Sequence, residues 1–154
     1  MKHYFKRTIR IVIMAGLMAL AGCDKDEPSP IKKEELTSGT GKWKLTALTV
    51  KALGQTEDAY SELETWEQDD IYFFNVNGTY QIQAGATKFD ASDPDIQESG
   101  TWEISGKHLI MQSIGEDTET VDILLLNTTT LKCSLKIDFF GVATTTTATY
   151  TKQL

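Results

Sequence analysis

The sequence is poor in the residue types on which catalysis and metal binding most often depend. Among 154 residues there are two cysteines and two histidines. His3 lies in the N-terminal segment, which leaves His108, directly after a Gly-Lys turn, as the other histidine. Neither a His-rich zinc site nor a Ser-His-Asp arrangement can be assembled from this set. We therefore expect no enzyme activity, no cofactor and no metal, with His108 exposed at the start of a strand.

Long apolar runs are also lacking. The apolar stretch Ile11–Leu20 has about half of the ~20 residues that a membrane-spanning helix needs. It follows a basic stretch with Lys2, Lys6 and Arg10, and small residues come after it. This is the three-part pattern of a secretory signal. We predict that residues 1–22 are a signal peptide.

The end of this segment, Leu20-Ala21-Gly22-Cys23, resembles the bacterial lipobox. In a lipobox the cysteine thiol receives a diacylglyceryl group and becomes the new N-terminus. Two acyl chains are enough for stable membrane anchoring. The resemblance implies lipidation of Cys23 and a location in the cell envelope, anchored to the outer membrane. The alternative is a chance cysteine beside an ordinary cleavage site.

The run Asp24-Lys25-Asp26-Glu27 resembles the short export signal that sends lipoproteins to the cell surface in gut-type Gram-negative bacteria. A solvated charged tether explains the same residues equally well. Two prolines follow in a segment without core residues, so we expect residues 23–40 to be the lipidated cysteine and a flexible tether. The folded domain is then predicted to cover 41–154.

Basic residues are scarce in the predicted mature chain. Removing residues 1–22 leaves 11 Lys and Arg against 22 Asp and Glu, a net charge of about −11 instead of −7. Such a chain lacks the basic surface that nucleic acids require, so no nucleic-acid partner is expected. Anionic lipid would also repel this negatively charged chain, so we expect the acyl chains alone to anchor it.

Lipidation of Cys23 leaves Cys133 without a disulfide partner. Cys133 alternates with Leu131 and Leu135 along a predicted strand. We therefore expect a buried structural thiol and not a nucleophile.

Beyond the tether, apolar residues recur at period two. Short segments rich in β-branched and aromatic residues are separated by Gly and Asn turn signals, which predicts eight strands. The predicted strands cover 42–50, 70–76, 79–84, 100–105, 108–114, 119–126, 131–139 and 144–152. Asn77-Gly78 predicts a type I′ hairpin turn, and Gly106-Lys107 predicts a second tight hairpin.

One stretch early in the chain breaks this pattern. Between Leu53 and Gln68, Tyr60 and Leu63 recur at helical spacing after Thr56, which can serve as an N-cap. We predict a short helix or lid there. A long polar loop is expected over 87–98.

Eight short antiparallel strands must close or stack, because an open sheet leaves an exposed edge. Sequential hairpins favour an all-β, eight-stranded up-and-down barrel. We expect the protein to be a monomer. Such an interior is just wide enough to be filled by side chains or to hold one small ligand. The residues expected to line a ligand pocket, or to fill the core instead, are Trp43, Tyr72, Phe73, Tyr80, Trp102, Leu109 and Leu135.

Gly41-x-Trp43 resembles the Gly-x-Trp of the lipocalins, whose Trp packs across the closed end of the barrel. Together with Asp69-Asp70, the 77–80 hairpin, Gly100-Thr101-Trp102 and the terminal strand, it resembles the lipocalin-like lipoproteins of gut Gram-negative bacteria. The resemblance covers nearly all of 41–152 and implies a calycin-type barrel with a binding role. Two positions that often carry cysteine in that family correspond to Trp66 and Phe89, so an aromatic contact is expected in place of a covalent link.

Two acidic groups are candidates for chemistry. Asp90, Asp93 and Asp95 could hold calcium, but the Gly and distal Glu of an EF-type loop are missing, which favours a solvated turn. Asp69 and Asp70 could form a carboxylate pair. Because adjacent strand residues point to opposite faces, a bond to a loop backbone is the better interpretation.

Two functions follow. The first is a lipid-anchored, non-catalytic protein that binds a small apolar or amphipathic ligand in the barrel. The alternative is an interaction module with a filled barrel, whose acidic loops 54–70 and 86–99 contact a protein or glycan partner.

Overall fold

The computed structural model of the protein describes residues 31–139 and 141–154, and it contains two short helices and nine strands over these residues. The helices are α1 (Lys33–Thr37) and α2 (Thr65–Gln68). The strands are β1 (Lys42–Ala52), β2 (Gln55–Asp58), β3 (Ile71–Phe74), β4 (Thr79–Gln83), β5 (Ile96–Ser105), β6 (His108–Ser113), β7 (Thr118–Leu126), β8 (Thr130–Phe139) and β9 (Val142–Lys152). No described helix combines the length and apolarity needed to cross a membrane.

The strands form a closed antiparallel barrel. The order is β2-β1-β3-β4-β5-β6-β7-β8-β9, and β9 pairs back onto β1 through contacts that run from Trp43–Lys152 to Ala52–Thr144. Eight strands make the ring, as the sequence predicts. The ninth, β2, lies outside the ring as a hairpin extension of β1. It was missed because all four of its residues are polar and exposed, so it has no alternation.

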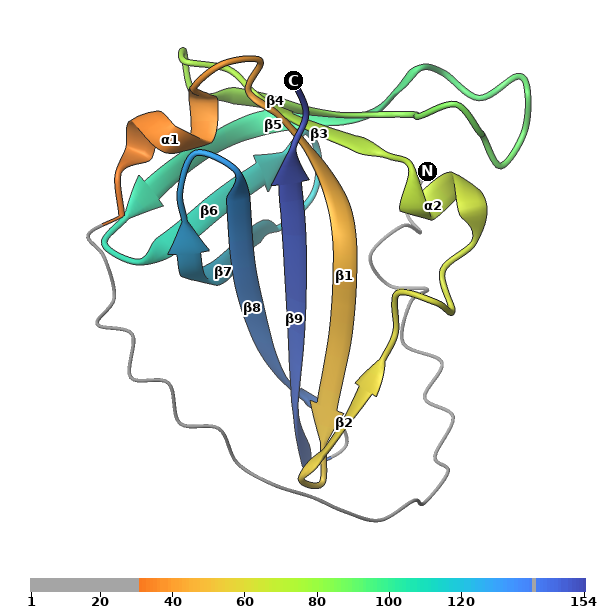
Figure 1. Cartoon of the computed structure of the whole chain (residues 1–154), viewed down its shortest axis with the longest axis vertical. Helices are drawn as coiled ribbons and strands as arrows, with labels where there is room; N and C mark the ends of the chain where they lie inside the picture. Colours follow the sequence, from red (N-terminus) through yellow and green to blue (C-terminus); the bar gives the residue numbers. More distant parts are fainter. Residues whose placement is uncertain (1–30, 140) are drawn as a thin grey trace.

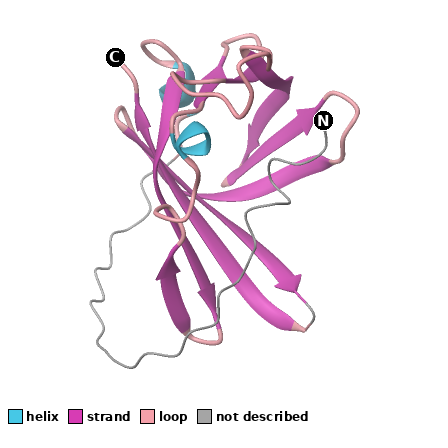
Figure 2. Cartoon of the chain, turned by 90° about the vertical axis from the view of Figure 1, so that its right-hand side faces the viewer, coloured by secondary structure: helices cyan, strands magenta, loops and turns pink. Residues whose placement is uncertain are grey.

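The two ends of the barrel differ. At one end, called the closed end below, lie α1, the turns at 75–78, 106–107 and 127–130, and the C-terminus. At the opposite open end lie the β1–β2 turn, loop 84–95 and the turn at 114–117. Figure 1 shows α1 beside the ends of β5 and β6 and the β1–β2 hairpin at the far end of the long strands. Figure 2 shows these strands spreading apart away from the helices.

The segment before β1 belongs to the packed domain. Leu36 of α1 is fully buried, and Ile31 packs against the same core cluster. The predicted tether therefore needs correction: residues 31–40 pack against the closed end, because Leu36 supplies the apolar side chain that covers Trp43. Residues 23–30 lie outside the described residues.

The first hairpin differs in detail from the prediction. The N–H of Gly78 donates to the Asn75 carbonyl at 3.1 Å, and that of Asn75 to the Thr79 carbonyl at 2.8 Å. Gly78 has a φ of +84°, whereas Asn77 does not have a positive φ. The loop thus has three residues, with glycine closing the turn as in a bulged hairpin, and the type I′ prediction is wrong. The Gly106-Lys107 hairpin is confirmed, with Gly106 at +60°.

The predicted helix is shorter than expected and begins later. Thr56 lies in β2, and α2 begins after Glu64. Glu64 and Glu67 form a capping box, in which the Glu64 N–H donates to Glu67 Oε2 at 2.9 Å. Thr56 as an N-cap was therefore wrong, since the reciprocal pair that satisfies the first turn is eight residues further on.

Candidate functional site

The predicted pocket residues separate into two groups along the barrel. Trp43, Tyr80, Trp102 and Leu109 are at most 4% exposed and pack with Phe74 in the core of the closed half. Tyr72 and Leu135 are half-buried and pack against the margin of this core, toward the open end. The closed half is filled, so any accessible interior lies toward the open end.

Phe73 does not belong to the interior. It pairs with Lys42, whose ammonium lies 5.7 Å from the Phe73 ring centroid, while its neighbour Tyr72 pairs with the inward-facing Trp43. Adjacent residues of a strand point to opposite faces. Predicting both Tyr72 and Phe73 as lining was therefore wrong for Phe73, which lies on the outer face.

Trp43 is the centre of the closed end. Its Nε1–H donates to the Leu36 carbonyl at 2.8 Å, and the Lys152 ammonium lies 4.6 Å from its ring centroid. Lys152 Nζ also donates to the carbonyls of Glu35 and Ser38, at 2.6 and 3.1 Å. Lys152 thereby fastens α1 over the barrel. Nothing in the sequence predicts this role, because Lys152 is a lone lysine near the C-terminus without a local motif.

A group of hydrogen-bonded polar side chains lies on the inner face of the barrel, over Gly100. Tyr80, Gly100 and Ser113 pair in a row across β4, β5 and β6. The Tyr80 hydroxyl passes over Gly100 to lie 2.7 Å from Ser113 Oγ, and both hydroxyls donate to Glu98 Oε1, Ser113 at 2.5 Å. Burial and the neighbouring Glu98 raise the pKa of Tyr80. Both Tyr80 and Ser113 thus hold Glu98 on the inner face.

Glu119 is a second carboxylate on the inner face. It pairs with Met111 of β6, next to the buried Val121 in the same inward register. Within the described part of the chain it accepts no hydrogen bond and forms no ion pair. Desolvation, and then the charge of Glu98, raises the pKa of Glu119 to about 7. An ionised Glu119 therefore gains from a cationic partner that the barrel itself does not supply.

Two tyrosines complete the inner surface beside these carboxylates. Tyr72 and Tyr150 meet edge to face, with ring centroids 5.0 Å apart. Desolvation raises the pKa of both hydroxyls; the next cause is the charge of Asp70 for Tyr72 and that of Tyr72 for Tyr150, and the charge of Glu119 adds a smaller contribution to each. Cys133 is buried, as predicted, and desolvation followed by the charge of Glu119 raises its pKa to about 12. It is a protonated thiol at neutral pH, unsuited to nucleophilic attack.

Glu98 and Glu119 were not among the predicted site residues, although the sequence carries a signal for both. Glu98 precedes Gly100 and Trp102 at period two, and Glu119 precedes Val121 and Ile123 in the same way. Each is a charged residue in the inward register of a strand. Such residues are costly to bury without a reason.

Asp69 and Asp70 fasten loop 84–95, which supports the loop-bonding interpretation. Asp69 Oδ2 accepts from the N–H and hydroxyl of Thr87, both at 2.9 Å. Asp70 accepts from Gln97 Nε2 at 3.1 Å and from the Gly85 N–H, while burial and then the charge of Asp69 raise its pKa to about 7. The pair positions the rim of the open end.

An aromatic contact fastens the same loop to α2. The rings of Trp66 and Phe89 meet edge to face with centroids 5.6 Å apart. This confirms the aromatic contact expected between these two positions.

The other candidates have local roles. Asp90 accepts from the N–H and hydroxyl of Ser92, Asp93 from the N–H of Asp90, and Asp95 pairs with Lys88 at 2.6 Å. These carboxylates therefore shape the loop, as a solvated turn does. His108, about half exposed, lies 2.9 Å from Asp122 of the neighbouring strand.

Two depressions lie on the outer face of the barrel. One of about 630 Å³ is bordered by β4, β5 and β6, and one of about 410 Å³ by β5, β6 and β7. Thr, Ser and Gln residues make up most of the first, which also borders Tyr80 and Gly100, and half of the second, which also borders Trp102, Glu103 and Ile110. Neither includes Glu98 or Glu119. We therefore take the inner surface near the open end, with Glu98, Glu119, Tyr72 and Tyr150, as the candidate site.

Comparison with known families matches residues 40–133 to the lipocalin-like domain. No curated protein gives a significant match.

Proposed function

Because the chain belongs to the lipocalin-like domain family, in which ligand binding without catalysis is general, we propose that it is a lipid-anchored protein that binds an amphipathic ligand at the open end of the barrel. The observation that supports this most is Glu119, a carboxylate on the inner face without a hydrogen-bond or ion-pair partner among the described residues. The ligand has an apolar body and a cationic head.

The apolar body is matched by half-buried side chains that face inward near the open end. They are Leu48 and Val50 of β1, Ile82 of β4, Met111 of β6 and Leu135 of β8. These side chains face inward and still keep part of their surface exposed, so an apolar chain that enters from the open end would cover them. An apolar chain there gains about 25 cal/mol for each Å² removed from water.

The charge of the head follows from the inner face. The inward-facing positions of the described strands carry Glu98 and Glu119, and the one basic residue among them is Lys152, which pairs with Trp43 at the closed end and is bonded to α1. Glu98 already accepts two hydrogen bonds, whereas Glu119 accepts none. An ammonium group donates only, so it complements Glu119, and a ligand carboxylate would be repelled.

We expect dodecylammonium to bind at pH 8 about tenfold more tightly than dodecanoate, since a hydrogen bond to a charged group contributes about 1.5–3 kcal/mol. The affinity for the amine should fall between pH 8 and pH 6, because Glu119 with a pKa of about 7 becomes protonated and loses its charge. Glu119→Gln should abolish both effects. Isothermal titration calorimetry measures each affinity.

Glu116→Gln is the matched control, because Glu116 lies exposed in the turn three residues before Glu119 and should leave binding unchanged. Tighter binding of dodecanoate than of the amine would contradict the proposed ligand class. Binding of neither would contradict the carrier function.

The anchoring part of the proposal depends on the resemblance of residues 20–23 to a lipobox, outside the described residues. In bacteria that process lipoproteins, Cys23→Ser should leave the chain unprocessed or soluble and remove palmitate labelling. Cys133→Ser is the control and should still be labelled, since Cys133 is buried. Normal labelling of Cys23→Ser would refute lipidation.

The alternative is a partner bound by the acidic loops. It is best tested by charge reversal at Glu62, which should abolish the capture of such a partner from an envelope extract. Glu62 is exposed and outside the capping box of Glu64 and Glu67, whose replacement would disturb α2.

A further inference from the structure

Charge is distributed unequally between the two ends of the barrel. The closed-end residues, 31–45, 73–80, 101–109, 122–134 and 149–154, carry seven lysines, three glutamates and one aspartate, Asp122, which lies beside His108. Apart from Lys152, which is bonded to α1, the lysines are Lys32, Lys33, Lys42, Lys44, Lys107 and Lys132. The remaining described residues carry three lysines and fifteen aspartates and glutamates. A strongly acidic protein thus has one basic end.

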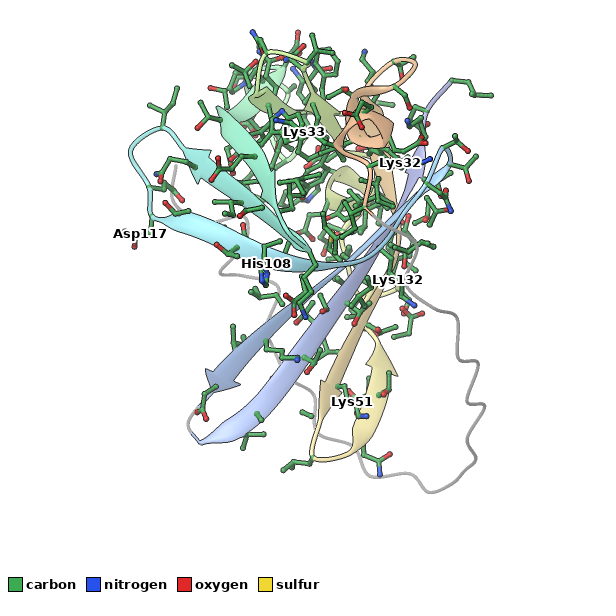
Figure 3. The ribbon with its side chains drawn as sticks, turned by 90° about the vertical axis from the view of Figure 1, so that its left-hand side faces the viewer. Lys32, Lys33, Lys51, His108, Asp117 and Lys132 are labelled. Carbon is green, nitrogen blue, oxygen red and sulfur yellow. The ribbon has the colours of Figure 1, made fainter. Side chains whose placement is uncertain are left out.

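The basic groups lie on the surface where a partner can reach them. Lys32, Lys33, Lys107 and Lys132 are exposed. Figure 3 shows Lys32 and Lys33 at α1 and Lys132 on β8, with Asp117 at a distant turn and Lys51 on the far hairpin.

The N-terminal segment enters the domain at this same end. Ile31 packs against the core cluster next to α1. The chain from Cys23 to Ile31 reaches at most about 29 Å when fully extended, and about 15 Å when relaxed. The eleven residues of β1 rise about 36 Å. A relaxed chain of this length therefore keeps the closed end, and not the open end, near an anchor at Cys23.

Resting on the lipid anchor proposed above, we propose that the closed end faces a membrane surface of anionic lipid headgroups and that the open end points away from it. The lysines attract the headgroups, and the acidic residues of the open end are repelled. This refines the expectation that anionic lipid repels the chain: the net charge repels, but the end beside the anchor attracts. The ligand site is then open to the aqueous side.

The test uses the full acylated protein, with its acyl mass confirmed, in vesicles of phosphatidylglycerol and phosphatidylcholine. A donor dye is attached at Thr128→Cys, in the closed-end turn, or at Leu53→Cys, in the β1–β2 turn, and an acceptor is placed in the headgroup layer. Cys133 is buried and remains unlabelled. We expect the Thr128 label to lie nearer the headgroups by about 30 Å, roughly the length of β1.

Charge reversal separates attraction from tethering. The triple variant Lys32→Glu, Lys33→Glu, Lys132→Glu should reduce this difference, as should pure phosphatidylcholine vesicles, because the tether alone then holds the closed end near the bilayer; an unchanged difference would contradict the attraction. Lys51→Glu with Lys136→Glu, two exposed positions toward the open end, is the control and should keep it. Equal transfer from both labels in the unreversed protein, or a closer Leu53 label, would overturn the proposal. Because acylation is confirmed first, neither outcome reflects a missing anchor, and amine binding is measured separately.

Discussion

Trp43→Ala should lower the free energy of unfolding by about 3–5 kcal/mol, a large part of the 5–15 kcal/mol typical of a domain. Trp43 is 0% exposed, so its removal leaves a cavity beneath α1. It also leaves the Leu36 carbonyl without its donor and Lys152 without the ring that its ammonium contacts. Urea unfolding of the non-acylated chain, followed by circular dichroism, measures the loss.

Two further variants are compared with Trp43→Ala. Trp43→Phe keeps an aromatic ring and removes the N–H, so it should cost less than the alanine. Phe89→Ala removes a 68% exposed ring from the rim, and we expect a loss below about 1 kcal/mol. If Trp43→Ala cost no more than Phe89→Ala, α1 would not be held by Trp43 and the closed end would be assembled in another way.

The fold could be predicted because most strands have one buried and one exposed face. In β8 the buried Leu131 and Cys133 flank the exposed Lys132. This alternation predicts both the strand and the face that points inward. Turn residues then set the connections, as at Gly106. The exceptions, β2 and α1, lack this alternation: β2 is exposed throughout, and α1 buries Leu36 alone.

The site could be predicted only in part, because its chemistry depends on contacts between distant strands. The alternation of the strand places Tyr72 inward. In contrast, nothing in the sequence near Glu98 indicates that its Oε1 accepts hydrogen bonds from Tyr80 and Ser113, which are eighteen and fifteen residues away. Likewise, whether an inward carboxylate is paired depends on the facing strands. Glu98 and Glu119 have the same kind of sequence context and opposite outcomes.

Gly100→Ala should lower the free energy of unfolding by about 3 kcal/mol, at the upper end of the usual cost of overpacking. A Cβ at this position would lie 2.1 Å from the Gln112 carbonyl oxygen and 2.9 Å from Tyr80 Cε1. The first contact is with backbone, so β5 and β6 must separate. The second displaces the Tyr80 ring, which breaks the bonds that hold Glu98.

Gly115→Ala is the control, because Gly115 has a φ of +81° and no atom within 4 Å of the added Cβ. It should cost about 1 kcal/mol of backbone strain, with hydrogen exchange of β5 and β6 unchanged. Gly100→Ala should accelerate exchange along both strands. A Gly100→Ala protein as stable as the original would show that β5 does not hold this register. Tyr80, Ser113 and Glu98 would then not form the network described above. Glu119 would no longer be distinguished as the unpaired carboxylate of the inner face.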